Sequence, residues 1–422
     1  MNEPELTSTP QAHDDHLLDQ HLIEWALSAL TQAKSTNNVP VPSDASAALP
    51  LQLPAQGLGA RAALEAMAQV ALAGAAKLHH PGYFAHMDPP TATVTWLAAM
   101  WQAAMNQNQL HPDVAPSSRS LEVRLIDWLA PYFNMHGGHL VPGSTIANLT
   151  AVWAARDLKG VRRVVASERA HLSLRKSAHL LGLAYESVAT NDQHQMQLSP
   201  TADYSDAVVV LTAGTVATGA IDPPVANQCG WLHMDAAWGG PLRFSDSHAA
   251  LLEHVATVDS VGFSAHKWCF QPKGAAVILF KEPDAAHAAM SYGGGYLAAP
   301  NIGVAGSAPA TAIPFAASLM AWGRDGLAQR IELGMQQAEV LAAKIQSDAR
   351  FELWGTPTTG VVVWRPRHLP AGVVRDQLND AWVSLTDIDG EVWLRSVAAN
   401  LSADASLVFA KVCAALETAT SE

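Results

Sequence analysis

Two apolar runs of the sequence lead into side chains that can do chemistry. The segment 231–238 (WLHMDAAW) carries Asp235 after its apolar residues, and the segment 262–268 (GFSAHKW) carries His266 and Lys267. Short apolar runs of this kind indicate buried strands of a parallel sheet. Ligands of open α/β sheets bind outside the carboxyl ends of the strands, so we expect these three side chains at one edge of the sheet.

A carboxylate and a lysine amine at adjacent strand ends suit pyridoxal 5'-phosphate (PLP). The amine of Lys267 can form a Schiff base with the aldehyde, and Asp235 can pair with the pyridinium nitrogen, which keeps the ring an electron sink. Each residue alone has an ordinary structural interpretation, because a lysine often ends a strand in solvent and an aspartate often caps a helix. The hypothesis therefore depends on the two residues together.

The spacing of the two motifs resembles a known family. Asp-Ala-Ala-Trp-Gly-Gly begins at Asp235, and Ser-Ala-His-Lys-Trp places Lys267 32 positions later. This combination is similar to the group II PLP-dependent amino-acid decarboxylases, which include the aromatic amino-acid, glutamate, histidine and diaminobutyrate decarboxylases. The resemblance covers most of 78–281 and is patchy elsewhere. It implies the α/β fold of PLP-dependent transferases (fold type I), with a mostly parallel seven-stranded central sheet and a smaller C-terminal α/β lobe.

Length and composition agree with a large globular enzyme. The chain has 422 residues, of which 49% are hydrophobic and 15% charged, so we expect several lobes: a helical segment 1–75, a PLP-binding domain 76–315 and a small domain 316–422. A net charge of −13 argues against nucleic acid or an anionic membrane as partner. Three cysteines give neither a disulfide framework nor metal-ligand spacing, and no signal peptide or membrane span is visible, so a cytoplasmic location is expected.

A Gly/Ser/Thr turn before an apolar helix offers a site for the cofactor phosphate. The segment 141–148 (VPGSTIAN) presents hydroxyls and free backbone N–H groups at the positive end of the helix dipole. An ordinary helix cap would use the same residues. The family resemblance favours Ser144 and Thr145 as phosphate ligands, and no dinucleotide or Walker motif is present.

The resemblance extends to further residues around the ring. His171, in Ala-His-Leu-Ser, matches the family imidazole that stacks on PLP and lies near the departing carboxylate. Thr215 follows the apolar strand 207–213, and Ala237 is small where the ring must lie close to the backbone. Ser264 and His266 flank the lysine, and Ser264 stands where the family often has Asn or Asp. From 222 to 229 we expect a helix that completes a βαβ step into the Asp235 strand.

The substrate side of the site is expected in two loops. The segment 80–90 (HPGYFAHMDPP) resembles the family's entry loop, which makes Phe84 and His86 candidate substrate-binding residues, although a histidine there can also be structural. A later Gly-rich loop, 291–297 (SYGGGYL), resembles the mobile lid whose tyrosine enters the neighbouring subunit's site and reprotonates Cα. Tyr296 is the candidate catalytic tyrosine, with Tyr292 as its rival. The family resemblance also implies a homodimer with sites at the subunit interface.

The chain departs from the family after the lid. Gly-Ser-Ala-Pro at 306–309 replaces the usual Gly-Ser-Arg-Arg, and the next arginine is Arg324. We expect decarboxylation of an L-amino acid to the amine and carbon dioxide, catalysed by Lys267, His171 and Tyr296. The departure leaves two alternatives open: another PLP reaction on the same fold (transamination, lyase chemistry or oxidation to an aldehyde), or a non-catalytic PLP-fold subunit.

Overall fold

The structure is a computed structural model that describes residues 18–35, 49–295, 297 and 301–421. The chain forms two compact units, 1–80 and 81–422, and the domain boundary predicted at 315/316 falls inside a long helix of the second unit. The first unit contains helices α1 (Gln20–Ser35) and α2 (Ala60–Ala68), the latter continued by a π-helical turn, Gln69–Ala73. Among the described residues, no helix has both the length and the apolar character needed to cross a membrane.

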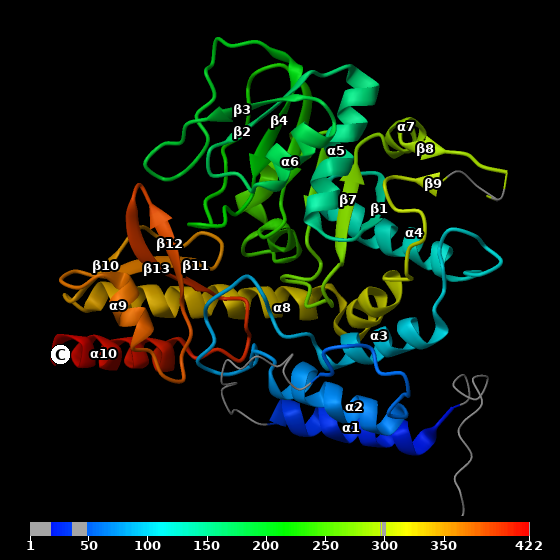
Figure 1. Cartoon of the computed structure of the whole chain (residues 1–422). Helices are drawn as coiled ribbons and strands as arrows, with labels where there is room; N and C mark the ends of the chain where they lie inside the picture. Colours follow the sequence, from blue (N-terminus) through cyan, green and yellow to red (C-terminus); the bar gives the residue numbers. More distant parts are fainter. Residues whose placement is uncertain (1–17, 36–48, 296, 298–300, 422) are drawn as a thin grey trace, which may run out of the picture. The chain divides into compact units, whose positions relative to one another are not determined.

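The second unit is built on a seven-stranded sheet (Figure 1), which confirms the predicted α/β fold with a mostly parallel sheet. The strand order is β1-β7-β6-β5-β4-β2-β3, and β7 alone runs antiparallel to its neighbours. Its strands are β1 (Gly137–Val141), β2 (Arg163–Ser167), β3 (Ala184–Val188), β4 (Tyr204–Thr212), β5 (Cys229–Asp235), β6 (Ser260–Phe263) and β7 (Ala276–Phe280). The register sets Thr212 beside Asp235 and Asp235 beside Gly262, so three strands end side by side.

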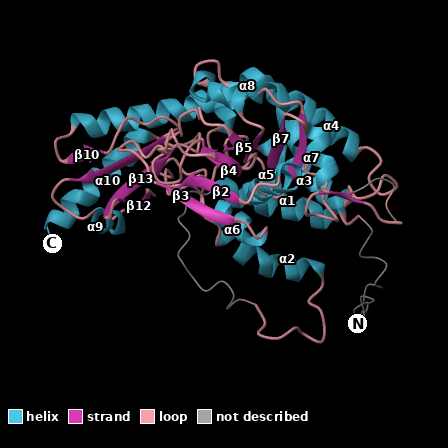
Figure 2. Ribbon diagram, turned by 90° about the horizontal axis from the view of Figure 1, so that it is seen from above, coloured by secondary structure: helices cyan, strands magenta, loops and turns pink. Residues whose placement is uncertain are grey.

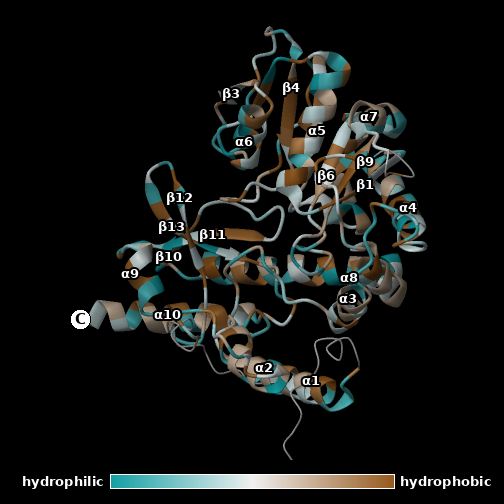
Figure 3. Cartoon of the chain, turned by 45° about the vertical axis from the view of Figure 1, so that its right-hand side comes forward, coloured by the Kyte–Doolittle hydropathy of each residue, from teal (hydrophilic) through white to brown (hydrophobic). Residues whose placement is uncertain are grey.

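Helices cover both faces of this sheet because successive strand residues point to opposite sides. Val208 and Val210 pack with the inner side chains of α5 (Ser144–Lys159), α6 (Ser173–Leu180) and α7 (Pro283–Ala289). Val209 and Leu211 face the other core, which includes side chains of α4 (Ser118–Leu129) and α8 (Ala312–Ser347). The hydrophobic colouring of β4 and β6 in Figure 3 reflects this burial on two sides.

The remaining elements before α8 are α3 (Thr93–Met105), the 3-10 turns Ala130–Phe133, Gly240–Phe244 and Ala249–Thr257, and the two-stranded β8 (Ser291–Tyr292) and β9 (Asn301–Ile302).

Helix α8 connects the large sheet to a smaller C-terminal sheet. It is interrupted at Gly323, whose φ of 62° departs from helical geometry. The small sheet has the order β10-β11-β13-β12 and lies beside α9 (Ala371–Asp376) and α10 (Ala405–Ser421) (Figure 2). Its strands are β10 (Phe351–Leu353), β11 (Val361–Pro366), β12 (Ser384–Ile388) and β13 (Glu391–Val397).

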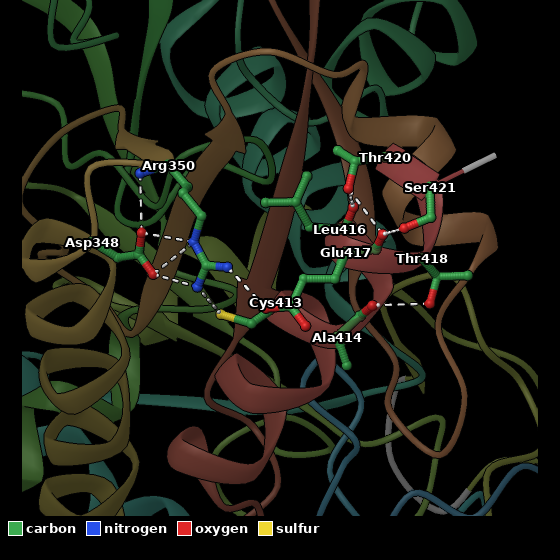
Figure 4. Close-up of polar contacts among 9 residues, drawn as sticks. All are labelled: Asp348, Arg350, Cys413, Ala414, Leu416, Glu417, Thr418, Thr420 and Ser421. Atoms are coloured by element: carbon green, nitrogen blue, oxygen red, sulfur yellow. Dashed lines mark hydrogen bonds and ion pairs between the residues drawn. The ribbon is translucent and has the colours of Figure 1, made fainter.

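Arg350 joins the start of the small sheet to the C-terminal helix (Figure 4). Its guanidinium donates to Asp348 on one side and to Cys413 Sγ (3.2 Å) and Glu417 Oε1 (3.2 Å) of α10 on the other. These bonds are at least partly exposed to solvent, so each contributes little alone. Together they connect α10 to Asp348, the residue that follows α8.

The helix predicted from 222 to 229 is wrong. Residues 222–228 contain no helix, and β4 passes to the parallel β5 through an extended connection. The consecutive prolines Pro223 and Pro224 explain the difference, because proline lacks an N–H donor and disfavours helical geometry in the residue before it. The buried carboxylate of Asp222 instead accepts hydrogen bonds from the backbone N–H groups of Met196 (2.7 Å) and Thr212 (2.8 Å).

Candidate active site

A cavity of about 270 Å³ opens where β4, β5 and β6 end. It is lined by Pro142, Gly143, Ser144, Thr145, His171, Thr212, Gly214, Val216, Asp235, Ala237, Ser264, His266 and Lys267. Eight of the ten predicted catalytic and cofactor-binding residues lie in this lining. The sheet brings them together because the carboxyl ends of neighbouring parallel strands share one edge.

Asp235 is the last residue of β5 and is held rigidly at the floor of the cavity. Its side chain is buried, with 3% exposure. Oδ2 accepts a hydrogen bond from Asn148 Nδ2 (2.8 Å), and Oδ1 accepts one from the Ala237 N–H (3.1 Å). Two donors of this kind fix the orientation of the carboxylate toward the cavity.

Lys267 lies in the turn after β6 and lines the same cavity. Burial lowers the pKa of its amine, while the carboxylates of Asp235 and Asp88 act in the opposite direction. Its Nζ lies 3.9 Å from Met87 Sδ, a weak contact that leaves the amine mobile. A lysine whose pKa is lowered in this way spends more time as the neutral, nucleophilic amine.

The start of α5 forms the opposite wall. Gly143 precedes the helix with φ 98°, and a Cβ at this position would enter open space toward the cavity. Helix α5 has no side-chain cap, so the N–H groups of its first turn remain available, at the positive end of the dipole. The hydroxyls of Ser144 and Ser264 contact each other across the cavity, and Thr145 lines it beside them. This donor set fits a phosphate group.

His171 stands at the rim, just before α6. Its Nδ1 receives hydrogen bonds from the hydroxyl (2.8 Å) and the backbone N–H (3.2 Å) of Ser173. Burial lowers the pKa of the imidazole, and the charge of Asp235 opposes this. His266 also lines the cavity, and its Nδ1 donates to the Ala275 carbonyl (2.9 Å). Burial lowers the pKa of His266 to about 4, so this ring is neutral at physiological pH.

The structure gives Thr215 and Phe84 positions outside the cavity lining. The buried Thr215 hydroxyl bonds Thr218 Oγ1 (3.0 Å) and accepts from the Ala220 N–H (3.0 Å), so it closes the turn after β4 while Val216 faces the cavity. Phe84 is fully buried in the core of the small lobe. Sequence pattern could not separate these two from their neighbours, because their environments are set by residues distant in the chain.

The side chain of His86 is exposed and is not part of the cavity lining. Partial shielding of its ring from water lowers its pKa, and the charge of Arg395 adds to this, while Asp88 opposes it. The predicted lid tyrosine, Tyr296, lies outside the described residues. Its rival Tyr292 is 61% exposed, with its ring 6.1 Å from that of Trp153 on α5.

Sequence reasoning did not select two residues that the structure places at the site, Asn148 and Arg395. Asn148 bonds Asp235 from α5, and its position just after the phosphate turn was the available signal. Arg395, on β13, is 7% exposed, and its charge acts on Lys267 and His86. Its position directly after the apolar run Val392–Leu394 was a signal, since an arginine is rarely buried without a charged or polar partner.

Replacing Gly214 with Ala tests how tightly this edge is built. Gly214 has φ +100°, and a Cβ there would lie 2.8 Å from Cδ1 of Trp238, a buried ring whose Nε1 donates to the Thr359 carbonyl (2.7 Å). We expect Gly214→Ala to lower the free energy of unfolding by about 1–3 kcal/mol, measured by urea denaturation. Gly355→Ala, where the Cβ meets open space and φ is not positive, is the matched control. Equal stabilities of the two variants would contradict the strain argument.

Comparison with known proteins decides the family. Residues 42–367 match the model of the pyridoxal-dependent decarboxylase conserved domain. The chain belongs to this family. Among curated relatives, the chain is 32% identical over 297 residues to L-2,4-diaminobutyrate decarboxylase of Acinetobacter baumannii, a match covering 59% of this chain and 58% of that enzyme. It is 31% identical over 351 residues to the enzyme of the same name from Rhizobium meliloti (strain 1021), covering 74% of this chain and 70% of the relative.

Solved structures agree on the fold. The glutamate decarboxylase domain of a diaminobutyrate-pyruvate transaminase and L-2,4-diaminobutyrate decarboxylase from Vibrio parahaemolyticus superposes with a TM-score of 0.84 at 20% identity, covering 97% of this chain and 100% of that one. Oryza sativa TDC with PLP and tryptamine gives a TM-score of 0.83 at 19% identity, covering 100% of this chain and 99% of that one. The cofactor of the family is PLP, and the lysine, carboxylate and helix terminus around the cavity fit its aldehyde, ring nitrogen and phosphate.

Proposed function

We propose that this decarboxylase converts an L-amino acid into the corresponding amine and carbon dioxide. The observation that carries the proposal is the cavity in which Lys267 and Asp235 face the first turn of α5. An amine, a fixed carboxylate and a phosphate-binding helix terminus are the three groups that one PLP molecule requires. When bound, PLP supplies the ring that takes up the electron pair released as carbon dioxide leaves.

Different residues of the cavity would hold the nitrogen, the phosphate and the faces of this ring. Asp235, fixed by two donors, would hold a proton on the pyridine nitrogen and so keep the ring electron-poor. Ser144, Thr145 and Ser264 would donate to the phosphate at the positive end of α5. Ala237 would leave room for the ring against the backbone, His171 would cover the ring, and His266, a neutral imidazole in the same lining, would border it.

Lys267 anchors the aldehyde and then moves protons. Because burial lowers the pKa of its amine, the side chain can take up or release a proton near neutral pH more readily than a surface lysine can. Tyr296 on the Gly-rich loop remains the proposed donor that returns a proton to Cα. His171, which lines the cavity, is the second candidate.

Arg395 is the group we assign to the substrate's carboxylate or an acidic side chain. Its Nη1 donates to Ser384 Oγ (3.0 Å), while its Nε makes no hydrogen bond within the described part of the chain. Burial lowers the pKa of this guanidinium to about 10, and Asp88, whose charge acts on it, is ion-paired with Lys273 instead. A buried cation of this kind is stabilised by an incoming anion. Arg395 can therefore take the role of the arginine pair that the family has near the position of Ser307 and that this chain lacks.

Replacing Arg395 with Gln should weaken substrate binding more than turnover. Loss of a charged hydrogen bond raises KM by roughly 10- to 100-fold, whereas kcat changes only a few-fold because the guanidinium holds the bound substrate and transfers no proton. Arg395→Lys keeps the charge and should recover part of the loss. Steady-state kinetics on the best substrate measure both, and a variant with normal KM and low kcat would contradict this role.

Product analysis tests the proposed reaction. The purified protein, supplied with PLP, is given a panel of L-amino acids headed by 2,4-diaminobutyrate and aspartate, the substrates named for relatives of this chain. Release of carbon dioxide with an equal amount of amine supports decarboxylation. A keto acid or an aldehyde as the main product would identify another PLP reaction, and no turnover across the panel would support a non-catalytic role.

We further propose a homodimer. Helices α3 and α4 both pack on α8, and the three helices expose large apolar side chains, namely Leu97, Met100, Trp101, Met105, Val123, Trp128 and Met320. Trp101 is 69% and Met320 74% exposed, which is unusual for a chain that works alone. A second copy is the occupant consistent with the family expectation, and it would bring the Gly-rich loop of each chain to the other's cavity.

A cytoplasmic location, supported by three unpaired cysteines, is part of the same proposal.

Sedimentation velocity should show a species of twice the chain mass. The double substitution Trp101→Glu with Met320→Glu should shift it to the monomer, because two charges would be buried without partners. Val392→Glu, which places the same charge at an exposed position of the small sheet (51% exposed), is the matched control and should leave the dimer intact. A wild-type protein that sediments as a monomer would rule out the proposal.

A further inference from the structure

Buried hydrogen bonds join the carboxylate of Asp235 to the imidazole of His171 through a single residue of α5. Asn148 is 1% exposed, and its Nδ2 donates to Asp235 Oδ2 (2.8 Å) and to Ser173 Oγ (2.9 Å). The Ser173 hydroxyl in turn reaches His171 Nδ1 (2.8 Å). The two side chains expected on either side of the cofactor ring are therefore connected by protein alone.

The orientation of the Asn148 amide follows from chemistry. A carboxylate only accepts hydrogen bonds, so the group that faces Asp235 must be the NH₂ and not the carbonyl. The Asn148 Oδ1 then faces His233 Nε2 (3.1 Å), which must carry a proton to donate to it. Burial lowers the pKa of His233 to about 4, so this ring is neutral and its Nδ1 is an acceptor.

The far end of the network agrees with this direction. Trp231 Nε1, which can only donate, gives its hydrogen to Ser260 Oγ (2.8 Å), and the Ser260 hydroxyl lies 2.9 Å from His233 Nδ1. Ser260 thus accepts from the indole and donates to the imidazole. Along this path each hydrogen runs toward Asp235, and His233 Nδ1 also lies 3.2 Å from the carbonyl oxygen of Ser260, to which it gives no hydrogen in this tautomer.

The same reasoning assigns the tautomer of His171. Since Asn148 donates to Ser173 Oγ, the Ser173 hydroxyl is free to donate to His171 Nδ1. The backbone N–H of Ser173 points at the same nitrogen (3.2 Å). Two donors aimed at Nδ1 require it to be unprotonated, so the proton of the neutral ring sits on Nε2.

We propose that Asn148 is a positioning residue that acts on both groups: its N–H fixes the carboxylate of Asp235 and, through Ser173, it holds His171 in the tautomer with its hydrogen on Nε2. That hydrogen is on the side of the ring away from Ser173, where it can be given to a substrate at the cavity. The inference rests on the proposed roles of Asp235 and His171, yet it is a statement about the protein before any cofactor binds.

The isosteric change Asn148→Asp reverses the network without changing its volume. An oxygen would then face Asp235 Oδ2 where an N–H now lies, and two carboxylates at that separation must share a proton. The Ser173 hydroxyl would turn toward the new carboxylate and present a lone pair to His171. We expect PLP binding to weaken on the order of tenfold to a hundredfold and His171 to lose its single tautomer.

The test uses apoprotein labelled with ¹⁵N-histidine, together with titration of PLP. In the wild type, the pair of ring ¹⁵N shifts of His171, assigned by comparison with His171→Asn, should be that of the neutral Nε2–H tautomer. Ser173→Ala removes only the hydroxyl that bonds His171 Nδ1. It should therefore alter the ring ¹⁵N shifts of His171 and leave the Kd of PLP within about threefold of the wild-type value. Asn148→Asp should alter both.

Thr150→Val is the matched control, because Thr150 is buried on the same helix but its hydroxyl donates only to the Ile146 carbonyl (2.7 Å). It should change neither the tautomer nor the Kd. An Nδ1–H signature for His171 in the wild type overturns the inference, even if Asn148→Asp fails to fold. So does an Asn148→Asp protein that keeps both wild-type properties. If the ¹⁵N results hold while no amino acid is decarboxylated, the proposed function fails and the network assignment stands.

Discussion

Lys267→Ala is expected to abolish covalent attachment of PLP and to reduce turnover by about 10⁴-fold. Lys267 is the one lysine in the cavity lining, and burial keeps its amine in a reactive state by lowering its pKa. Without it, the cofactor has no anchor for its aldehyde and the substrate has no amine to exchange with. In the wild type, borohydride reduction followed by peptide mass spectrometry should place the pyridoxyl phosphate group on the peptide containing Lys267.

Lys281→Ala is the control for this prediction. Lys281 follows β7, where its Nζ donates to the Ala256 carbonyl (2.7 Å), and it is not part of the cavity lining. This variant should retain the label and the activity. A Lys267→Ala protein that is still labelled at a single lysine, or that still turns over at a substantial rate, would show that another amine carries the cofactor.

Asp235→Asn should lower kcat on the order of 10²- to 10³-fold while PLP binding is partly retained. The amide has the shape of the carboxylate but no charge, so it cannot hold a proton on the pyridine nitrogen, and the ring accepts electrons less readily. Binding survives in part because the lysine and the phosphate donors of α5 are unchanged. The measurements are kcat from carbon dioxide release and the Kd of PLP from fluorescence titration.

Asp259, a second aspartate at the same sheet, provides the control for Asp235→Asn. Asp259 lies at the opposite end, just before β6, where its Oδ2 accepts the Leu232 N–H (2.7 Å). Asn at this position can accept the same bond, so Asp259→Asn should be close to wild type in both kcat and Kd. Nearly unchanged turnover in Asp235→Asn would show that the carboxylate does not act on the ring.

Local patterns were sufficient for the elements that place the reactive groups. The apolar runs that predicted strands before Asp235 and Lys267 became β5 and β6, and the turn before Ser144 begins α5. These predictions succeed because strand and helix periodicity are properties of neighbouring residues. The connection from 222 to 229 shows the limit of the method, since two prolines outweighed the expectation of a βαβ helix.

By itself, the sequence determined which residues can react and that they lie at strand ends: a lysine, an aspartate, a phosphate turn and a histidine. Only the tertiary structure decided what surrounds them. It buried Phe84 in the small lobe, turned the Thr215 hydroxyl into its own loop, and brought Arg395 and Asn148 to the site. The physical reason is that burial and hydrogen-bond partners depend on sheet register and on contacts between residues 87 to 299 positions apart, such as Asn148 with Asp235 and Ser384 with the Ala85 carbonyl, and no local pattern encodes these.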